Sequence, residues 1–401
     1  MSKVFLIDAK RSPIGKFLGT LSSVAPSDLA AQVIKNVIET NKIDASMIDE
    51  VILGNVLSAG HGQNIARQAS IKAGIPTEVP ALSLNMVCGS GMKSLMIAYN
   101  NVKADMGDLM IVGGVEVMSQ APFIASHKMR AGVKMGNLNL EDTIISDGLT
   151  DAFHHYHMGI TAENIVEKYK ITKEEQDMLA IQSQERAIAA SDSGRFKEEI
   201  VAIEVKSRKE TLSFDKDEYP NRATSLLKLA NLRPAFKKEG TVTAGNASGI
   251  NDGASILLVA SEAAVNKYDL QPIGEIIAVG QGGVDPSVMG LGPVKAIENA
   301  LSKHDIQMKD IGLLELNEAF AAQALGVMHE LKNTYDLTDE WLLERINVNG
   351  GAIALGHPLG ASGARIITTL VHEMKKSKVK FGLASLCIGG GMGTAVIIKS
   401  V

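Results

Sequence analysis

One order of strands and helices occurs twice in this chain, and it constrains the fold more than any other feature. In its first occurrence, β-rich apolar runs at residues 4–7, 50–53 and 109–112 alternate with amphipathic stretches at 27–40 and 91–102. Short apolar runs of this kind predict buried strands, and apolar residues at helical spacing predict helices. This alternation is typical of α/β proteins.

The second occurrence begins with an expected strand at residues 276–279 and continues with strands at 311–316 and 380–386. Matching strands are offset by 260 residues (311 − 51) in one case and by 272 (381 − 109) in another. Each half has a glycine-rich turn before its third helix, CGSGMKS or GHPLGASGAR, and a strand followed by glycines, IVGG or LCIGGGMG. We infer an internal duplication, although the two halves share little sequence identity.

The stretch between the two patterns differs from both halves. It contains expected helices at 159–168 and 173–190 but no regular alternation, and an expected strand at 254–260 then closes the first half. An insertion within the first half explains this order. The expected units are an N-terminal half of residues 1–118 and 247–270, an inserted domain of residues 119–246, and a C-terminal half of residues 271–401.

Composition excludes several classes of function. Aromatic residues make up 4% of the 401 residues and the net charge is -5, which disfavours a nucleic-acid partner because affinity for phosphates comes mainly from Lys and Arg. No run approaches the roughly 20 apolar residues that span a bilayer, and the run at 4–7 is too short for a signal peptide. Two cysteines provide no disulfide framework. We therefore expect a cytoplasmic enzyme without a membrane partner.

Two further patterns argue against a metal or a permanently bound cofactor. His154, His155 and His157 lie close together, but no cysteine or carboxylate at recognised ligand spacing accompanies them. The glycines of GGVEVM at 113–118 and GGGMG at 389–393 are too loosely spaced for a dinucleotide fingerprint. We expect neither kind of group.

Cys88 is the first candidate for chemistry. It follows a strand-like run and precedes a helix, where the positive end of the helix dipole favours a thiolate. Gly89 and Gly91 permit a tight turn and the close approach of a substrate. The alternative is a buried core cysteine, which is common for this residue type.

His357 and Cys387 strengthen the case for catalysis. His357 lies in a glycine- and proline-rich loop, which suits a side chain that points into a cleft better than one that packs in a core. It could accept the proton of a thiol, and the alternative is a structural histidine at the start of a helix. Cys387 ends an apolar strand before a glycine turn, whose N–H groups could form an oxyanion hole. Two thiols and one imidazole at strand ends indicate thioester chemistry, in which one thiol carries an acyl group.

These segments resemble the signature segments of the thiolase family. The matching stretches are NMVCGSGMK, NEAFAAQ at 317–323, GGAIALGHPLGASGAR and CIGGGMGTA, and the resemblance extends over nearly the full length of the chain. It implies an α/β thiolase fold, a duplicated five-layered αβαβα arrangement with an inserted loop domain that covers the coenzyme A site. It also implies a homotetramer, in which the basic segment HKMRAGVK contacts other subunits.

The resemblance assigns roles to five residues by their positions in these motifs. It implies that Cys88 is the acylated nucleophile, that His357 is its base, and that Cys387 moves the proton of the second acetyl group. Asn317 would hold a water that forms one oxyanion hole together with His357. The backbone N–H groups of Cys88 and Gly389 would form the other.

The resemblance also implies which residues contact coenzyme A or the acyl group. Members of the family often have a basic residue near position 221 for the adenine end, and this chain has Asn221 followed by Arg222. The implied binding residues are His157, Met158, Leu149, Arg222, Phe236, Ser248, Met289 and Phe320.

Three alternatives remain after these assignments. The sequence HMG at 157–159 favours a short-chain thiolase that joins two acetyl-CoA molecules into acetoacetyl-CoA, because long-chain degradative members usually lack this histidine. A broader 3-ketoacyl-CoA thiolase of fatty-acid degradation is the second possibility. A non-catalytic acyl-CoA-binding protein of the same fold is the third, although no catalytic residue is missing. A ketoacyl synthase normally pairs its cysteine with two histidines, which leaves Cys387 unexplained.

Overall fold

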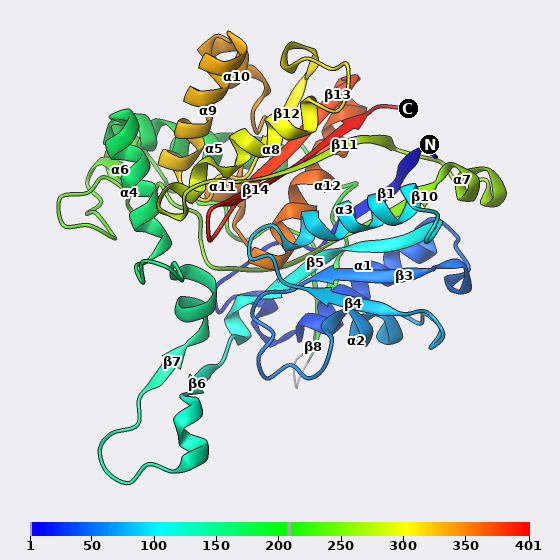
Figure 1. Cartoon of the computed structure of the whole chain (residues 1–401), viewed down its shortest axis with the longest axis horizontal. Helices are drawn as coiled ribbons and strands as arrows, with labels where there is room; N and C mark the ends of the chain where they lie inside the picture. The colour runs from blue at the N-terminus through cyan, green and yellow to red at the C-terminus, as the bar shows by residue number, and fades with distance from the viewer. Residues whose placement is uncertain (1, 207–209) are drawn as a thin grey trace.

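Strands from both halves of the chain form one ten-stranded sheet (Figure 1). The computed structural model describes residues 2–206 and 210–401. The strand order is β12-β13-β14-β11-β1-β10-β5-β3-β4, and β2 pairs with β10 beside this path. The strands of this sheet are β1 (Val4–Arg11), β2 (Gly15–Lys16), β3 (Glu50–Gly54), β4 (Ala81–Leu84), β5 (Leu109–Val117), β10 (Asn251–Ser261), β11 (Gly274–Gly283), β12 (Leu313–Leu316), β13 (Phe381–Ile388) and β14 (Met392–Lys399).

The two halves of the sheet repeat one topology, which confirms the predicted duplication. In the N-terminal half the order is β1-β10-β5-β3-β4, with antiparallel pairing up to β5 and parallel pairing beyond it. The C-terminal half has the order β11-β14-β13-β12 with the same change of direction, and a single parallel bridge from Leu314 to Ile346 takes the place of β4. The halves join where β1 pairs with β11 through only Phe5–Glu275 and Leu6–Gly274.

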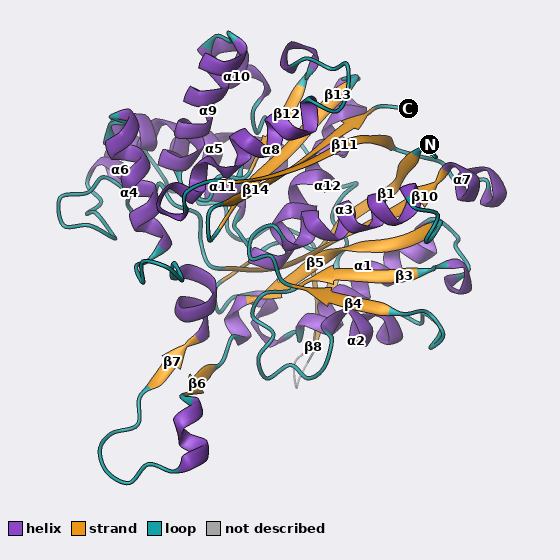
Figure 2. Ribbon diagram, in the orientation of Figure 1, coloured by secondary structure: helices purple, strands orange, loops and turns teal. Residues whose placement is uncertain are grey.

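Helices complete the five layers of the predicted αβαβα arrangement (Figure 2). Two helices pack against each other and against strands of both halves, so they form the central layer. Four others cover the outer faces, α1 and α2 on the N-terminal half and α8 and α9 on the C-terminal half. The central helices are α3 (Ser90–Lys103) and α12 (Leu359–Ser377), and the outer ones are α1 (Pro26–Thr40), α2 (Ile65–Lys72), α8 (Gly292–Leu301) and α9 (Ala321–Tyr335).

The composition of α12 follows from its central position. The helix begins directly after Pro358 and is buried on every side over its first four turns, as expected for a helix between the two halves of the sheet. Lys375 and Lys376 lie in its last turn, where the negative end of the helix dipole favours cations. It ends at Lys378, whose left-handed φ of 54° reverses the chain.

The inserted segment between β5 and β10 has an irregular architecture. Its helices α4 and α5 pack on α9, while the hairpin of β6 and β7 projects away from the body (Figure 1). Phe123, Met135 and Leu140 on this projection are 63%, 94% and 58% exposed. The elements of the segment are β6 (Phe123–Ala125), β7 (Leu140–Asp142), α4 (Met158–Tyr169), α5 (Lys173–Asp192), β8 (Ile203–Lys206), β9 (Thr211–Phe214) and α6 (Leu226–Ala230).

Three short helices complete the α-helices of the described residues. They are α7 (Glu262–Tyr268), α10 (Asp339–Arg345) and α11 (Ala352–Leu355). Across residues 2–206 and 210–401, no helix combines the length and the apolar character that crossing a membrane requires.

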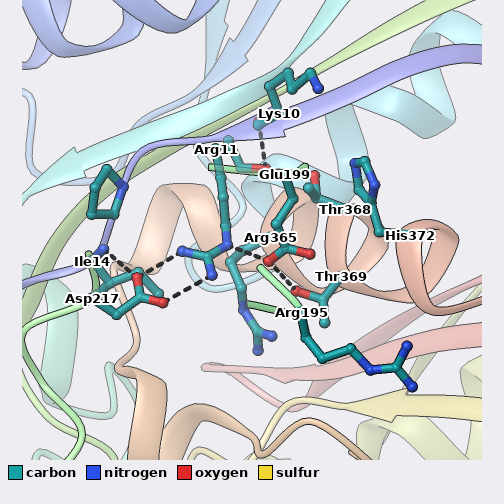
Figure 3. Close-up of polar contacts among 12 residues, drawn as sticks. Lys10, Arg11, Ile14, Arg195, Glu199, Asp217, Arg365, Thr368, Thr369 and His372 are labelled. Carbon is teal, nitrogen blue, oxygen red and sulfur yellow. Dashed lines mark hydrogen bonds and ion pairs between the residues drawn. The ribbon is translucent and has the colours of Figure 1, made fainter. Parts of the chain in front are cut away.

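A buried ion cluster fixes the insertion to β1 (Figure 3). The guanidinium of Arg11 donates to Glu199 Oε1 at 2.6 Å and to both oxygens of Asp217 at 2.7 and 2.9 Å. Asp217 also accepts the backbone N–H of Ile14, and Thr369 on α12 donates to Glu199. Removing one partner of such a cluster leaves an uncompensated buried charge. The cluster therefore holds the insertion, β1 and α12 in one arrangement.

Candidate active site

Cys88 lies in the tight turn between β4 and α3. Val87, directly before it, has a φ of 46°, which is unfavourable for a β-branched residue and marks a strained turn. Ser90 closes the turn, because its hydroxyl donates to the carbonyl of Val87 and accepts the N–H of Met86. A Cβ atom on Gly89 would lie 2.3 Å from Ile388 Cδ1, so a larger residue here would have to displace the end of that side chain. The turn leaves the Cys88 side chain half-buried.

The thiol of Cys88 needs a base before it can act as a nucleophile. Burial raises its pKa to about 11, although the backbone N–H of Gly389 and its own N–H act in the opposite direction. The negative charge of Glu116 raises this pKa further. At neutral pH the free protein therefore holds Cys88 as a thiol.

His357 is placed to be that base. Its backbone N–H donates to Asn251 Oδ1 at 3.0 Å, and its Nδ1 lies 2.5 Å from the hydroxyl of Ser362. Because this hydroxyl donates to the carbonyl of Pro358, Nδ1 carries the hydrogen and Nε2 keeps its lone pair. Among the described residues Nε2 has no hydrogen-bond partner. Burial, together with the charge of Arg365, lowers the pKa of His357 to about 4, so the ring is neutral at physiological pH.

Cys387 ends β13 next to the same pocket. It is fully buried, and burial together with the nearby Cys88 sulfur raises its pKa above the usual range for a thiol. The turn after it requires glycine, because Gly390 and Gly391 have φ values of 86° and 85°. This turn directs the N–H of Gly389 toward the Cys88 sulfur.

Asn317 follows β12 and is 1% exposed. Its backbone N–H donates to Ser385, but within the described chain neither atom of its side-chain amide has a hydrogen-bond partner. Buried amides are normally satisfied by protein or water, so this side chain has the capacity to hold a water or a substrate oxygen. The neighbouring Glu318 differs, because it accepts bonds from Ser183, Asn347 and a backbone N–H.

A pocket of about 330 Å³ joins four of the five predicted catalytic residues, and Asn317 is not among the residues that line it. The side chains of Cys88, His357 and Cys387 line it together with Gly389, although they come from distant parts of the sequence. Seven of the eight predicted binding residues also line it: Leu149, His157, Met158, Phe236, Ser248, Met289 and Phe320.

Three aromatic rings form one wall of this pocket. His157 accepts the N–H of Gly159 at its Nδ1, so its Nε2 carries the hydrogen. Its ring stacks on Phe236 with the centroids 4.5 Å apart, and Phe236 meets Phe320 edge to face. A Cβ atom on Gly159 would lie 2.2 Å from the ring of Phe236. The wall therefore depends on glycine at position 159.

Arg222 is not brought together with the other predicted residues. It is exposed, pairs with Asp192 at 2.5 Å and does not line the pocket. Asn221 instead lines a second hollow of about 590 Å³, which shares Tyr219 and Ala244 with the pocket. The second hollow also contains Lys16 and Lys228.

The structure adds two residues that the sequence interpretation missed. Ser362 lies five residues after His357, and only knowledge of where α12 begins reveals that the hydroxyl reaches the imidazole. Tyr219 lies in an irregular part of the insertion that gives no periodic signal. Its hydroxyl packs where a Cβ atom of Gly249 would stand, and its ring lies between the pocket and the second hollow.

Comparison with known families identifies the class of protein. Residues 4–263 match the N-terminal domain of thiolases, and residues 270–400 match the C-terminal domain. The chain therefore belongs to the thiolase family, and it is an acyltransferase.

Individual relatives cover the whole chain. An acetyl-CoA acetyltransferase of Pseudomonas aeruginosa is 49% identical over 99% of both chains, and a probable acetyl-CoA acyltransferase of Staphylococcus epidermidis is 50% identical over 100% of this chain and 99% of its own. The crystal structure of the Bacillus anthracis acetyl-CoA acetyltransferase matches with a TM-score of 0.95 and 42% identity, covering 100% of this chain and 99% of that one. Human mitochondrial 3-ketoacyl-CoA thiolase matches with a TM-score of 0.94 and 43% identity over the same shares.

Proposed function

We propose that this chain is an acetyl-CoA C-acetyltransferase, which reversibly joins two acetyl-CoA molecules into acetoacetyl-CoA and coenzyme A. The observation that carries the proposal is the pocket itself, where two thiols and a neutral imidazole with a free Nε2 lie together. The names of the bacterial relatives support the same acetyl specificity.

The first half-reaction needs a nucleophile and an oxyanion site. Nε2 of His357 takes the proton of Cys88, and the sulfur attacks the thioester carbonyl of acetyl-CoA. The oxyanion is stabilised by the N–H groups of Cys88 and Gly389, which already lie near the sulfur. Coenzyme A leaves with the proton of Cys387, which becomes a thiolate. The acetyl group stays on Cys88, and His357 keeps the Cys88 proton at Nε2.

The second half-reaction forms the carbon–carbon bond. Cys387 in its thiolate form removes the α-proton of a second acetyl-CoA, and the resulting enolate attacks the acetyl group on Cys88. The enolate oxygen is held by Nε2–H of His357 and by a water on Asn317, whose amide has free hydrogen-bonding capacity. Acetoacetyl-CoA leaves, and the Cys88 sulfur takes back its proton from Nε2 of His357, while Cys387 keeps the α-proton, so all three groups return to their starting state. All proton transfers use groups of this chain, so coenzyme A is a substrate and no permanent cofactor is required.

We assign the cover of the coenzyme A site to the inserted domain of residues 119–246. Its Leu149, His157, Met158 and Phe236 face the pocket, whereas the three reactive side chains come from the two halves. Ser248, which follows the insertion, is assigned to the pantetheine. The second hollow with Lys16 and Lys228 suits the phosphates of the nucleotide, since both side chains are cationic.

Two further assignments concern the assembly and the compartment. We propose a homotetramer, because the projecting hairpin exposes apolar side chains and β4 leaves an unpaired sheet edge. Light scattering of a variant in which residues 124–141 are replaced by a short glycine linker should show a smaller oligomer. We place the protein in the cytoplasm, which agrees with two reactive thiols that need reducing conditions.

A chain-length assay tests the proposed substrate. We expect thiolysis of acetoacetyl-CoA to be far faster than thiolysis of C8 or C16 3-ketoacyl-CoA. Comparable rates on the long chains would reject the acetyl specificity in favour of a broader 3-ketoacyl-CoA thiolase, the function named for the similar human mitochondrial structure. Incubation with labelled acetyl-CoA covers the remaining possibility, because a non-catalytic binding protein leaves Cys88 unlabelled.

A further inference from the structure

Glu116 is a buried carboxylate that the proposed reaction does not use. It lies near the end of β5, in the GGVEVM segment, and is 0% exposed. Its Oε1 accepts the side-chain N–H of Asn55 and the backbone N–H of Leu57, each at 3.0 Å. Its Oε2 accepts the N–H of Val56 at 3.0 Å and that of Gly360 at 2.8 Å. Burial raises the pKa of this carboxyl to about 7, and the accepted N–H bonds act in the opposite direction because they favour the ionised form.

These four bonds connect elements that surround the pocket. Gly360 belongs to the first turn of α12 and follows His357 by three residues. Leu57 packs in one apolar cluster with Leu359 and Cys88, and Leu359 lines the pocket. The carboxylate therefore lies behind the pocket and ties the start of α12 to the loop that follows β3.

Small residues allow the first turn of α12 to lie close to the turn that carries Cys88. A Cβ atom on Gly91 would lie 2.8 Å from the carbonyl of Gly360, and one on Gly363 would lie 2.4 Å from the N–H of Met92. A Cβ atom on Gly114 would lie 1.9 Å from that same carbonyl of Gly360. The first turns of α3 and α12 thus touch backbone to backbone, next to β5.

We infer that Glu116 is a positioning residue, which holds the turn of His357 against the turn of Cys88 so that Nε2 can reach the sulfur. The inference rests on the proposed roles of these two residues. The carboxylate contacts neither substrate nor the reacting atoms, and it acts through the backbone of α12. Misplacement of reacting groups by about 1 Å can reduce a rate about 100-fold.

The matched control is Asp252 on the neighbouring strand. It is also a buried carboxylate, and it pairs in the sheet with Val117 on β5, the residue that follows Glu116. It accepts from Ser119, through the backbone N–H and the hydroxyl, and from the backbone N–H of Met118, and among the described residues it has no bond to α12. E116Q and D252N therefore each remove one buried negative charge, but only E116Q places an amide N–H₂ against the donors that hold α12.

The test measures the rate at which iodoacetamide alkylates Cys88, by peptide mass mapping at pH 7.5, together with thiolysis of acetoacetyl-CoA. If Glu116 positions the two turns, E116Q slows alkylation and lowers kcat roughly 100-fold with little change in KM, while D252N stays close to wild type. If Glu116 acted only by its charge, E116Q would speed alkylation, because the nearby negative charge opposes the thiolate. Faster or unchanged alkylation, or a wild-type kcat, overturns the inference.

A second variant covers the case in which E116Q does not fold. G360A keeps the carboxylate, but its Cβ atom would lie 2.8 Å from Glu116 Oε2 and 2.9 Å from the carbonyl of Val115, which pushes the start of α12 away. We expect slower alkylation of Cys88 in G360A as well, and a wild-type rate in the folded variant overturns the inference. Alkylation needs no acyl-CoA, so its rate can be compared between wild type and variants even in a protein without thiolase activity. Absence of thiolase activity in the wild-type protein would refute the proposed function but would leave the comparison of alkylation rates valid.

Discussion

The turns that carry Cys88 and His357 occupy matching places in the two halves, each before a helix of the central layer. The first turn is strained at Val87 and leaves its thiol half-exposed to the pocket. The second buries its imidazole and holds the ring at Nδ1 through Ser362, while Asn251 accepts the backbone N–H of His357. A thiol nucleophile needs access to substrate, whereas a general base needs a fixed tautomer. The duplication thus repeated the scaffold while the side-chain environments of the two turns diverged.

The largest expected loss of activity comes from replacing either thiol, and labelling of Cys88 distinguishes their two roles. We predict that C88A abolishes thiolysis, with a loss of at least about 10⁴-fold, because the acyl-carrying thiol is lost and the remaining thiol, Cys387, is fully buried. C387A should lose net condensation to a similar extent but still acquire label on Cys88 from labelled acetyl-CoA. Mass spectrometry of the two variants distinguishes the roles, and a C387A protein that takes no label contradicts the division of labour.

The burial of His357 should appear in the pH dependence of stability. Its pKa is lowered to about 4 from an ordinary value of 6.5, so between these pH values the unfolded chain binds a proton that the folded chain does not. This group therefore makes the protein less stable as the pH falls from about 6.5 to 4, by up to about 3 kcal/mol. Urea unfolding of H357N across this range should show a correspondingly smaller loss. An identical pH dependence in both proteins would mean that the histidine is not held neutral.

The tautomer of His357 is tested at Ser362. S362A removes the only acceptor that Nδ1–H has among the described side chains, and we predict a decrease in kcat of roughly 30-fold with a nearly unchanged KM. S362T retains a hydroxyl and should recover part of the rate. If S362A has full activity, the backbone alone fixes the ring, and the two turns are more alike than the structure indicates.

The smallest expected effect concerns the aromatic wall of the pocket. G159A forces the ring of Phe236 away from its stack on His157, because the new Cβ atom would lie 2.2 Å from it. We predict an increase of about tenfold in KM for acetyl-CoA with a smaller change in kcat. G107A is the control, since its Cβ atom meets only the flexible end of Met110 and Asp49, away from the pocket. Equal KM values in the two variants would argue against a binding role for this wall.

Much of the scaffold could be predicted from the sequence. Apolar periodicity located α1, α3, α4, α5 and the strand β10 close to their observed limits, because each buries a face whose spacing reflects its own geometry. The single bridge at Ile346 could not be predicted, since one backbone pairing leaves no pattern of side chains. The surroundings of Arg222 were also unpredictable, because its ion pair with Asp192 depends on how the insertion folds back.

The sequence by itself determined which side chains are candidates for the reactive groups, because two cysteines and one loop histidine stand in glycine-rich turns. Only the tertiary structure decided their state. Burial raises the pKa of both thiols and lowers that of His357, and Ser362 selects the ring nitrogen that stays free. These properties depend on the local dielectric and on hydrogen-bond partners far away in the chain, which come together only when the two halves close around α3 and α12.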